Sequence, residues 1–457
     1  MLKFKIPIFK ENITMKDIFP DFINFFRNKA KKFPDKRVGS NSTYTIEDIT
    51  LSAFSVFHMQ SPSFLQFQKN MEKNEGKSNA QSLFGLNTIP SDNHIRNILD
   101  SVSATELSPM YGKQLNYLKD AKILDTYRYM GKYYPIALDG TQYYSSKKIS
   151  CEKCLIRGED EDMRYSHQVV TPIIVSPFRA EVIPLMPEFI RNEDGSQKQD
   201  CEINASKRWL KREVSLNLPR LLLGDDLYAH EPFCRKVMEN KDSFVFVAKE
   251  TSHQKMYEFI EYIEKTVERE TKEITMGKAH KKEIWKYTFL NTVPINGHKD
   301  ALEVNWLKIE VYSAKTEKRK YHNTFITDIE ISTDNVHDIG RIGRTRWKVE
   351  NENNNTLKTK GYHLEHNFGH GREHLSELLT SMNILAFLFH TVLSLLDENY
   401  AKAKAKRTRE RFFNEIEIFT SYIYFPSWKV LMKFMSRGRD SPLIAISDLM
   451  DISELEK

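Results

Sequence analysis

The spacing of apolar residues predicts helices at both ends of the chain and strands in its middle. Over residues 1–110, phenylalanine, isoleucine and leucine recur three or four positions apart, as they do on one face of a helix. Thr45 with Asp48 fits the pattern of a helix N-cap. Between residues 133 and 247, short apolar runs end in acids, glycine or proline, which is typical of strands. The chain is therefore expected to have an α/β fold.

Two of the apolar runs end in aspartate. Residues 133–138 lead into Asp139, and residues 221–224 lead into the pair Asp225 and Asp226. Taken alone, an Asp-Gly step signals a turn, and a strand often ends in a charged turn. After the second run the pattern continues as a helix and then a strand. Acids in this position could instead line a site at the end of a sheet.

A third acid, Glu350, lies in a run rich in arginine and asparagine. Helical spacing places Arg346 one turn earlier on the same face, where the common outcome is a surface salt bridge. The run has few apolar residues that could anchor it. An acid held among bases and amides also suits a metal site beside a phosphate backbone.

Residues 346–350, Arg-Trp-Lys-Val-Glu, resemble the third acidic motif of bacterial insertion-sequence DDE transposases. Residues 361–371 are similar to one branch of the group that has a β-rich insertion between the second Asp and the Glu. Residues 138–146 resemble the first Asp motif of the same branch. The second motif, Gly-Asp-x-Leu-Tyr, selects Asp225 and leaves Asp226 as the alternative.

The resemblance implies an RNase H-like catalytic core with a β-rich insertion subdomain, flanked by mainly helical N- and C-terminal regions. The expected divisions are a helical, terminal-repeat-binding domain over 1–110, the first part of the core over 111–249, the insertion over 250–335, the end of the core with the Glu helix over 336–395, and a helical basic region over 396–457.

In the implied reaction, Asp139, Asp225 and Glu350 bind two Mg²⁺ or Mn²⁺ ions for phosphoryl transfer. The function would be cleavage of DNA at the element's terminal inverted repeats and strand transfer into target DNA by a homodimer at the bacterial nucleoid, in the cytoplasm. Three alternatives are an RNase H-like nuclease that does not join, a catalytically inactive DNA-binding derivative, and a structural DNA-binding module held by zinc.

Two positions depart from the family pattern. The group usually has Tyr one turn before the arginine, where this chain has Gly343, and its Lys after the Glu is displaced by about one residue, to Lys358. Arg346 and Lys358 are still the expected basic partners of the acids and the DNA.

Charge adds modest support for a nucleic-acid partner. The 457 residues carry a formal net charge of +6, and the sequence pI is about 8.8. The resemblance and the local density of basic residues point to DNA contacts at Arg341, Arg344, Arg346, Lys348, Lys404, Arg407 and Arg409.

Cysteine usage suggests a metal rather than disulfides. The chain has four cysteines and no N-terminal apolar segment of the kind found in signal peptides. Cys151 and Cys154 form a CxxC pair that His167 and Cys201 could complete as a zinc site. Reduced structural thiols and a redox pair are the alternatives. The apolar run 382–396 is too short for a membrane span and predicts a buried core helix.

Overall fold

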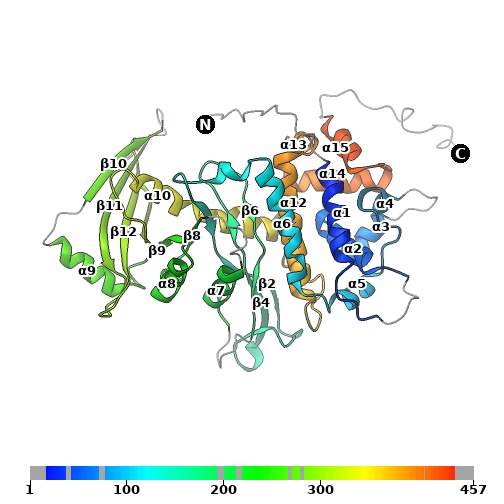
Figure 1. Cartoon of the computed structure of the whole chain (residues 1–457), viewed down its shortest axis with the longest axis horizontal. Helices are drawn as coiled ribbons and strands as arrows, with labels where there is room; N and C mark the ends of the chain where they lie inside the picture. Colours follow the sequence, from blue (N-terminus) through cyan, green and yellow to red (C-terminus); the bar gives the residue numbers. More distant parts are fainter. Residues whose placement is uncertain are drawn as a thin grey trace.

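The structure is a computed structural model, and it describes residues 17–37, 43–71, 78–192, 200–212, 219–265, 270–277, 282–405 and 407–437. Within these ranges the fold is mixed α/β, as predicted. It has a nine-stranded mixed sheet, a four-stranded antiparallel sheet, and helical regions at both ends of the chain. In Figure 1 the strands occupy the left and centre, and the helical regions lie together on the right.

The N-terminal region is helical within its described residues. Its helices are α1 (Ile18–Ala30), α2 (Ile46–His58), α3 (Phe64–Met71), α4 (Asn79–Phe84), α5 (Asp92–Leu99) and α6 (Ser108–Asp120). The Thr45 side chain accepts a hydrogen bond from the amide of Asp48, so the predicted cap is confirmed. Ser91 caps α5 in the same way.

The C-terminal helices pack against the N-terminal ones. They are α12 (Leu375–Leu396), α13 (Glu398–Lys404), α14 (Arg409–Tyr422) and α15 (Trp428–Ser436). The rings of Phe19 and Trp428 stack with their centroids 4.3 Å apart, and the side chain of Asn79 donates to the carbonyl of Thr420. The described N- and C-terminal helices therefore form one helical body.

Helix α12 runs along the boundary between this helical body and the sheets (Figure 1). Its length and composition would allow it to cross a membrane, but most of its residues are buried inside the protein. The prediction of a buried core helix for residues 382–396 is confirmed.

Three long antiparallel strands form the centre, each divided into two pieces. The pieces in chain order are β1 (Tyr134–Ala137) and β2 (Gly140–Ser146), then β4 (Arg164–Val170) and β5 (Ile173–Ile174), then β6 (Ile183–Pro184) and β7 (Glu188–Ile190). The pairing continues across each break, because Ala137 faces Ile173 and Gly140 faces Val170. Strand β3 (Leu155–Arg157) joins the outer end of β4.

Two parallel strands continue the central sheet on the other side of β1. Helix α7 (Glu202–Arg212) leads to β8 (Arg220–Gly224), which runs parallel to β1. Helix α8 (Glu231–Glu239) then leads to β9 (Ser243–Val247), parallel to β8. All residues of β8 and β9 are buried, which explains their continuous apolar sequence.

The segment predicted as a β-rich insertion is indeed β-rich, but its strands extend the central sheet. Helix α9 (Gln254–Glu264) precedes four antiparallel strands: β10 (Glu270–Met276), β11 (Glu283–Pro294), β12 (Glu303–Ser313) and β13 (Arg319–Thr327). Strand β13 pairs with β9, so the strand order becomes β10-β11-β12-β13-β9-β8-β1-β5-β6.

Helix α10 (Val336–Thr345) crosses this extended sheet at close range. A Cβ atom at Gly343 would come within 2.9 Å of the Phe325 ring, and one at Gly340 would come within 2.6 Å of Ile309. The absence of a tyrosine at position 343 therefore has a packing cause, because any side chain there would push the helix off the sheet.

Candidate catalytic centre and metal cluster

Asp139 and Asp225 occupy equivalent places on neighbouring strands. Ala137 pairs with Leu223 in the parallel ladder between β1 and β8, and each aspartate follows its strand residue by two positions. The amide of Leu138 also donates to the carbonyl of Leu223 at 2.9 Å. The carboxyl ends of adjacent parallel strands meet at one edge of a sheet, and ligands of α/β proteins commonly bind there.

The Asp139 carboxylate is mostly enclosed. Its pKa is raised to about 7, mainly by burial and then by the nearby negative charges of Glu202, Glu350 and Asp225, against the lowering effect of Arg346. These four residues are distant from Asp139 in the sequence, but they lie close enough to it for their charges to affect its ionisation.

The two candidates for the second acid face different surroundings. Asp226 accepts a hydrogen bond from the amide of Lys249 at 2.6 Å and lies 3.4 Å from the His253 imidazole. Among the described contacts, the Asp225 carboxylate accepts only a local bond, from the amide of Leu227, and its charge raises the pKa values of Asp139 and Glu202. These contacts favour Asp225 as the acid that faces Asp139.

Glu350 lies in a π-helical turn, Val349–Asn354, between α10 and α11 (Asn355–Thr359). The amide of Asn355 donates to the carbonyl of Glu350, which is the wider i to i+5 spacing of a π-helix. Such turns are frequent at functional sites. Arg346 forms the predicted salt bridge with Glu350 at 2.6 Å, and 48% of the Glu350 side chain stays exposed.

The three acids are near one another without forming a tight group. Among the described residues, only a separate Cys/His cluster brings three or more metal-binding side chains within 4.8 Å. Two ions about 4 Å apart with ligands at about 2.1 Å can hold oxygens up to about 8 Å apart. An all-oxygen set of this kind suits Mg²⁺ or Mn²⁺.

The basic residues near Glu350 divide into two sets. Arg344 lies over the rings of Trp285 and Tyr321, and with Arg346 and the exposed Trp347 it lines a cavity of about 350 Å³. Arg341 lies over the Phe178 ring, and Lys358 is paired with Glu365 at 2.9 Å.

The prediction of Lys348 as a DNA contact needs correction. Its ammonium group is buried and donates to the carbonyls of Ser176 and Arg179, and burial lowers its pKa. Lys348 therefore anchors the segment before Glu350 to the core, where it is unavailable to a phosphate backbone.

The C-terminal basic residues also point inward more than the sequence suggests. Lys404 is mostly buried with a pKa lowered to about 8 by desolvation, and it donates to Ser394. Arg407 is paired with Glu415. Arg409 donates to the Tyr362 hydroxyl and lies over that ring. These contacts hold α13 and α14 against the core, and they give the predicted DNA-contact residues Lys404, Arg407 and Arg409 partners within the protein.

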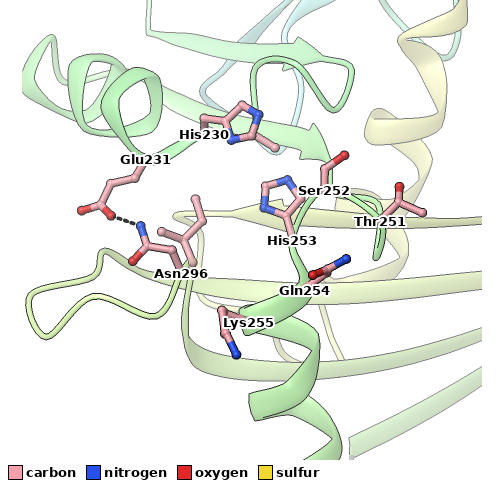
Figure 2. Close-up of a pocket in the computed structure, with 10 residues that line it drawn as sticks. His230, Glu231, Thr251, Ser252, His253, Gln254, Lys255 and Asn296 are labelled. Carbon is pink, nitrogen blue, oxygen red and sulfur yellow. Dashed lines mark hydrogen bonds between the residues drawn. The ribbon is translucent and has the colours of Figure 1, made fainter.

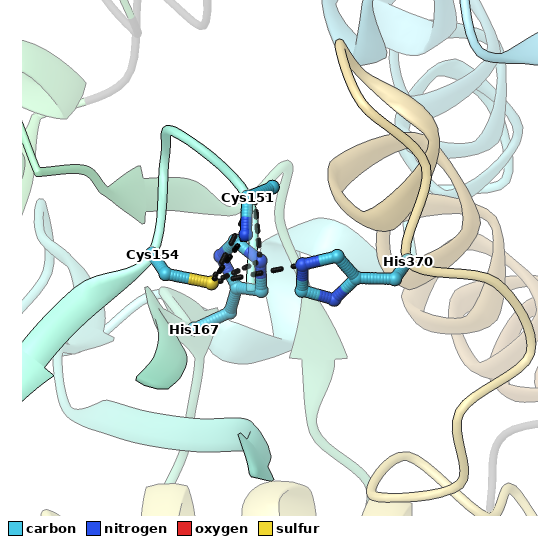
Figure 3. Close-up of side chains that lie close together, drawn as sticks. All are labelled: Cys151, Cys154, His167 and His370. Carbon is cyan, nitrogen blue, oxygen red and sulfur yellow. Dashed lines mark hydrogen bonds between the residues drawn. The ribbon is translucent and has the colours of Figure 1, made fainter. Parts of the chain in front are cut away.

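The Cys/His cluster consists of Cys151, Cys154, His167 and His370 (Figure 3). The two sulfurs are 3.8 Å apart, both lie 3.5 Å from Nε2 of His167, and Cys154 Sγ lies 3.6 Å from Nε2 of His370. A tetrahedral zinc ion with Zn–S near 2.3 Å and Zn–N near 2.1 Å separates two sulfurs by about 3.8 Å and a sulfur from a nitrogen by about 3.6 Å. The cluster could hold a metal such as zinc.

The predicted fourth ligand, Cys201, is wrong. Its thiol is exposed and free, whereas His370 completes the set from the loop before α12. Hydrogen bonds from Cys154 and the two imidazoles hold the pKa of the Cys151 thiol well below its usual range, which favours the thiolate that a metal binds. His370 lies in the Gly-His-Gly run after the Glu motif, so sequence proximity to the cysteines could not reveal it.

A further hollow of about 350 Å³ lies between the first residues of α8 and α9 (Figure 2). The imidazoles of His230 and His253 stack in it with centroids 5.3 Å apart, and Asn296 donates to Glu231. His253 of this hollow lies 3.4 Å from the Asp226 carboxylate. The hollow does not include Asp139 or Asp225.

No protein-family model matches the chain, and no curated protein matches it significantly.

Proposed function

We propose that the chain is a DDE transposase of a bacterial insertion sequence, which cuts DNA at the element ends and transfers them into target DNA. The observation that carries the proposal is the register of β1 and β8, which sets Asp139 and Asp225 side by side, with the charge of Glu350 acting on Asp139. The three acids are those of the sequence motifs, and the first and third lie 211 positions apart.

An RNase H-like core is part of the proposal. The sheet order β6-β5-β1-β8-β9 supports it, because β5 is antiparallel to its neighbours β6 and β1 while β8 and β9 run parallel to β1. Helix α7 before β8 and helix α8 between β8 and β9 also support it. The β-rich segment lies between β9 and α10, which is the interval between the second Asp and the Glu. That location agrees with the branch of transposases that the motifs resemble.

The roles of the acidic side chains follow from their chemistry. When bound, two divalent ions activate the attacking water or 3′ hydroxyl and stabilise the leaving oxygen. Asp139, Asp225 and Glu350 would hold these ions. Arg346 directs the Glu350 carboxylate and adds positive charge on the side where a phosphate backbone approaches.

The surface around Glu350 supports a nucleic-acid substrate. Arg344, Arg346 and the exposed Trp347 line one cavity next to the candidate catalytic acid. Arginine and tryptophan together bind phosphates and stack on bases. Because an element has two ends, a homodimer would bring both into one complex.

We also propose that the Cys/His cluster binds a structural zinc ion. His370 lies in a loop that is fixed on its other side by Asp100, whose carboxylate accepts hydrogen bonds from the amides of Arg372, Glu373, His374 and Leu375. A metal at the cluster would therefore fasten the β2–β4 hairpin to a loop held by the N-terminal helices. A set of four protein ligands leaves no open position for catalysis.

The deciding experiment incubates the full chain with Mg²⁺ or Mn²⁺ and a duplex that carries the inverted repeats flanking its reading frame. A duplex with scrambled repeats is the control. Repeat-dependent cleavage followed by joining to a second DNA supports the transposase. Cleavage without joining indicates the nuclease alternative, repeat binding without cleavage indicates an inactive derivative, and the absence of all three activities overturns the proposal.

A further inference from the structure

Glu202 is a fourth carboxylate at the candidate catalytic centre that the sequence motifs do not include. It is the first residue of α7, and its Oε1 accepts two hydrogen bonds. One comes from the amide of Gly140 at 2.9 Å and the other from the Tyr228 hydroxyl at 2.7 Å. Gly140 directly follows Asp139, and Tyr228 lies three residues after Asp225. Glu202 therefore connects the turns that carry the two aspartates.

The Glu202 carboxylate occupies the space that a side chain at position 140 would need. A Cβ atom at position 140 would come within 2.3 Å of Oε2 of Glu202. Any residue other than glycine after Asp139 would displace the Glu202 carboxylate from the catalytic edge of the sheet. The Asp-Gly step, which alone signals only a turn, thus has a steric role at this site.

The charges around Glu202 are unfavourable for a carboxylate. Burial raises its pKa, and the charge of Asp225 raises it further, while the bonds from Tyr228 and Gly140 lower it. Among the charges that act on Asp139, that of Glu202 has the largest effect. No lysine or arginine forms an ion pair with Glu202 within the described part of the chain. Four carboxylates with one arginine leave a net negative charge that a cation would neutralise.

We propose that Glu202 is a further ligand of the divalent ions at this centre, an inference that rests on the proposed function. Hydrogen bonds to Oε1 hold the carboxylate in place, and Oε2 lies beside Gly140, the residue that follows Asp139. A carboxylate held in this way among three other acids has the oxygen chemistry that Mg²⁺ and Mn²⁺ prefer.

A purely positioning role is the competing explanation. In that case Glu202 would matter because it accepts the hydrogen bond from the Gly140 amide and so fixes the turn after Asp139. Two substitutions separate the explanations. Glu202→Gln keeps an oxygen that accepts both hydrogen bonds but removes the charge, whereas Tyr228→Phe keeps the charge and removes one hydrogen bond.

The test measures Mn²⁺ binding to the full chain by calorimetry, and melting temperature with and without Mn²⁺. We expect Glu202→Gln to weaken Mn²⁺ binding at least 10-fold and to lose most of the Mn²⁺-dependent rise in melting temperature. Without metal, this variant should melt at or above the wild-type temperature, because one of four repelling charges is gone. Tyr228→Phe should bind Mn²⁺ within about 3-fold of wild type. Glu231→Gln, at the start of α8, is the matched control and should leave binding unchanged.

Wild-type Mn²⁺ affinity in Glu202→Gln would overturn the inference, and so would an equal loss in Glu202→Gln and Tyr228→Phe. The proposed function is judged separately by wild-type cleavage of the repeats. Wild-type cleavage together with normal Mn²⁺ binding by Glu202→Gln would refute only the role of Glu202. A wild-type protein that neither binds Mn²⁺ nor cuts the repeats would refute both.

Discussion

The side-chain amide of Asn354 donates a hydrogen bond to the carboxylate of Asp139 at 2.7 Å, although the two residues are 215 positions apart. The orientation of that amide is fixed, because its oxygen accepts bonds from the Thr171 hydroxyl at 2.7 Å and from the Asn353 amide at 2.9 Å. Asn354 ends the π-helical turn that contains Glu350. The turn of the third acid is thus joined directly to the first acid.

Asn354→Asp should strongly impair the protein. The substitution keeps the shape and the acceptor for Thr171, but it replaces the donor to Asp139 with a further negative charge beside four carboxylates. We expect cleavage to fall at least 100-fold and stability to fall by about 1–3 kcal/mol. Single-turnover cleavage and urea unfolding measure the two effects. Asn355→Asp, on the exposed next residue, is the control, and equal losses in both variants would contradict a specific role for Asn354.

The sequence predicted the acids but not the residues that hold them. Asp139, Asp225 and Glu350 could be named as candidates because each follows a strand or lies in a motif that local patterns mark. Glu202 and Asn354 could not, since their roles depend on contacts across 62 and 215 positions. Lys348 and Lys404 show the same limit, because a basic residue in a polar run has the same sequence pattern whether its ammonium group faces water or backbone carbonyls.

Zinc content should depend on His370 and not on Cys201. His370→Ala removes one of four ligands, whereas Cys201→Ser changes an exposed thiol outside the cluster. Metal analysis should find about one zinc ion per chain in wild type and in Cys201→Ser, and much less in His370→Ala after dialysis against a chelator. The melting temperature of His370→Ala should also fall. Equal zinc in all three proteins would show that the cluster is not the binding site.

Acid should destabilise the helical body through His58. This imidazole is buried among aromatic rings, neither ring nitrogen has a hydrogen-bond partner within the described residues, and desolvation lowers its pKa to about 3. The unfolded chain binds the proton near pH 6.5, so this contribution to stability is present above pH 6.5 and is lost as pH falls from 6.5 towards 3.

His58→Phe tests whether His58 causes this loss of stability at low pH. For a single group the loss approaches about 1.4 kcal/mol per pH unit below 6.5. The free energy of unfolding, measured by urea titration between pH 7 and 4.5, should therefore fall less steeply in His58→Phe than in wild type. Parallel curves for the two proteins would show that His58 is protonated in the folded state at these pH values.

The last prediction concerns Glu350, for which the structure supplies a matched control two residues away. Glu350 is half exposed and acts on Asp139, whereas Glu352 lines a separate cavity with Lys404 and Arg409. Glu350→Gln keeps the size and hydrogen-bonding shape of the side chain but removes the charge that metal ions need. We expect it to lose cleavage and joining while it binds the element ends as well as wild type or slightly better, because an acid near the phosphates is neutralised.

Arg346→Ala should weaken both repeat binding and cleavage, since it removes a cation from the same face, and Glu352→Gln should retain both activities. If Arg346 and Glu350 formed only a surface ion pair, either change would cost at most about 1 kcal/mol of stability and leave activity intact. Gel shift and cleavage assays on the same preparations, with folding checked by circular dichroism, distinguish these outcomes. Full cleavage by a folded Glu350→Gln protein would remove Glu350 from the catalytic centre, and with it the role proposed here for the π-helical turn.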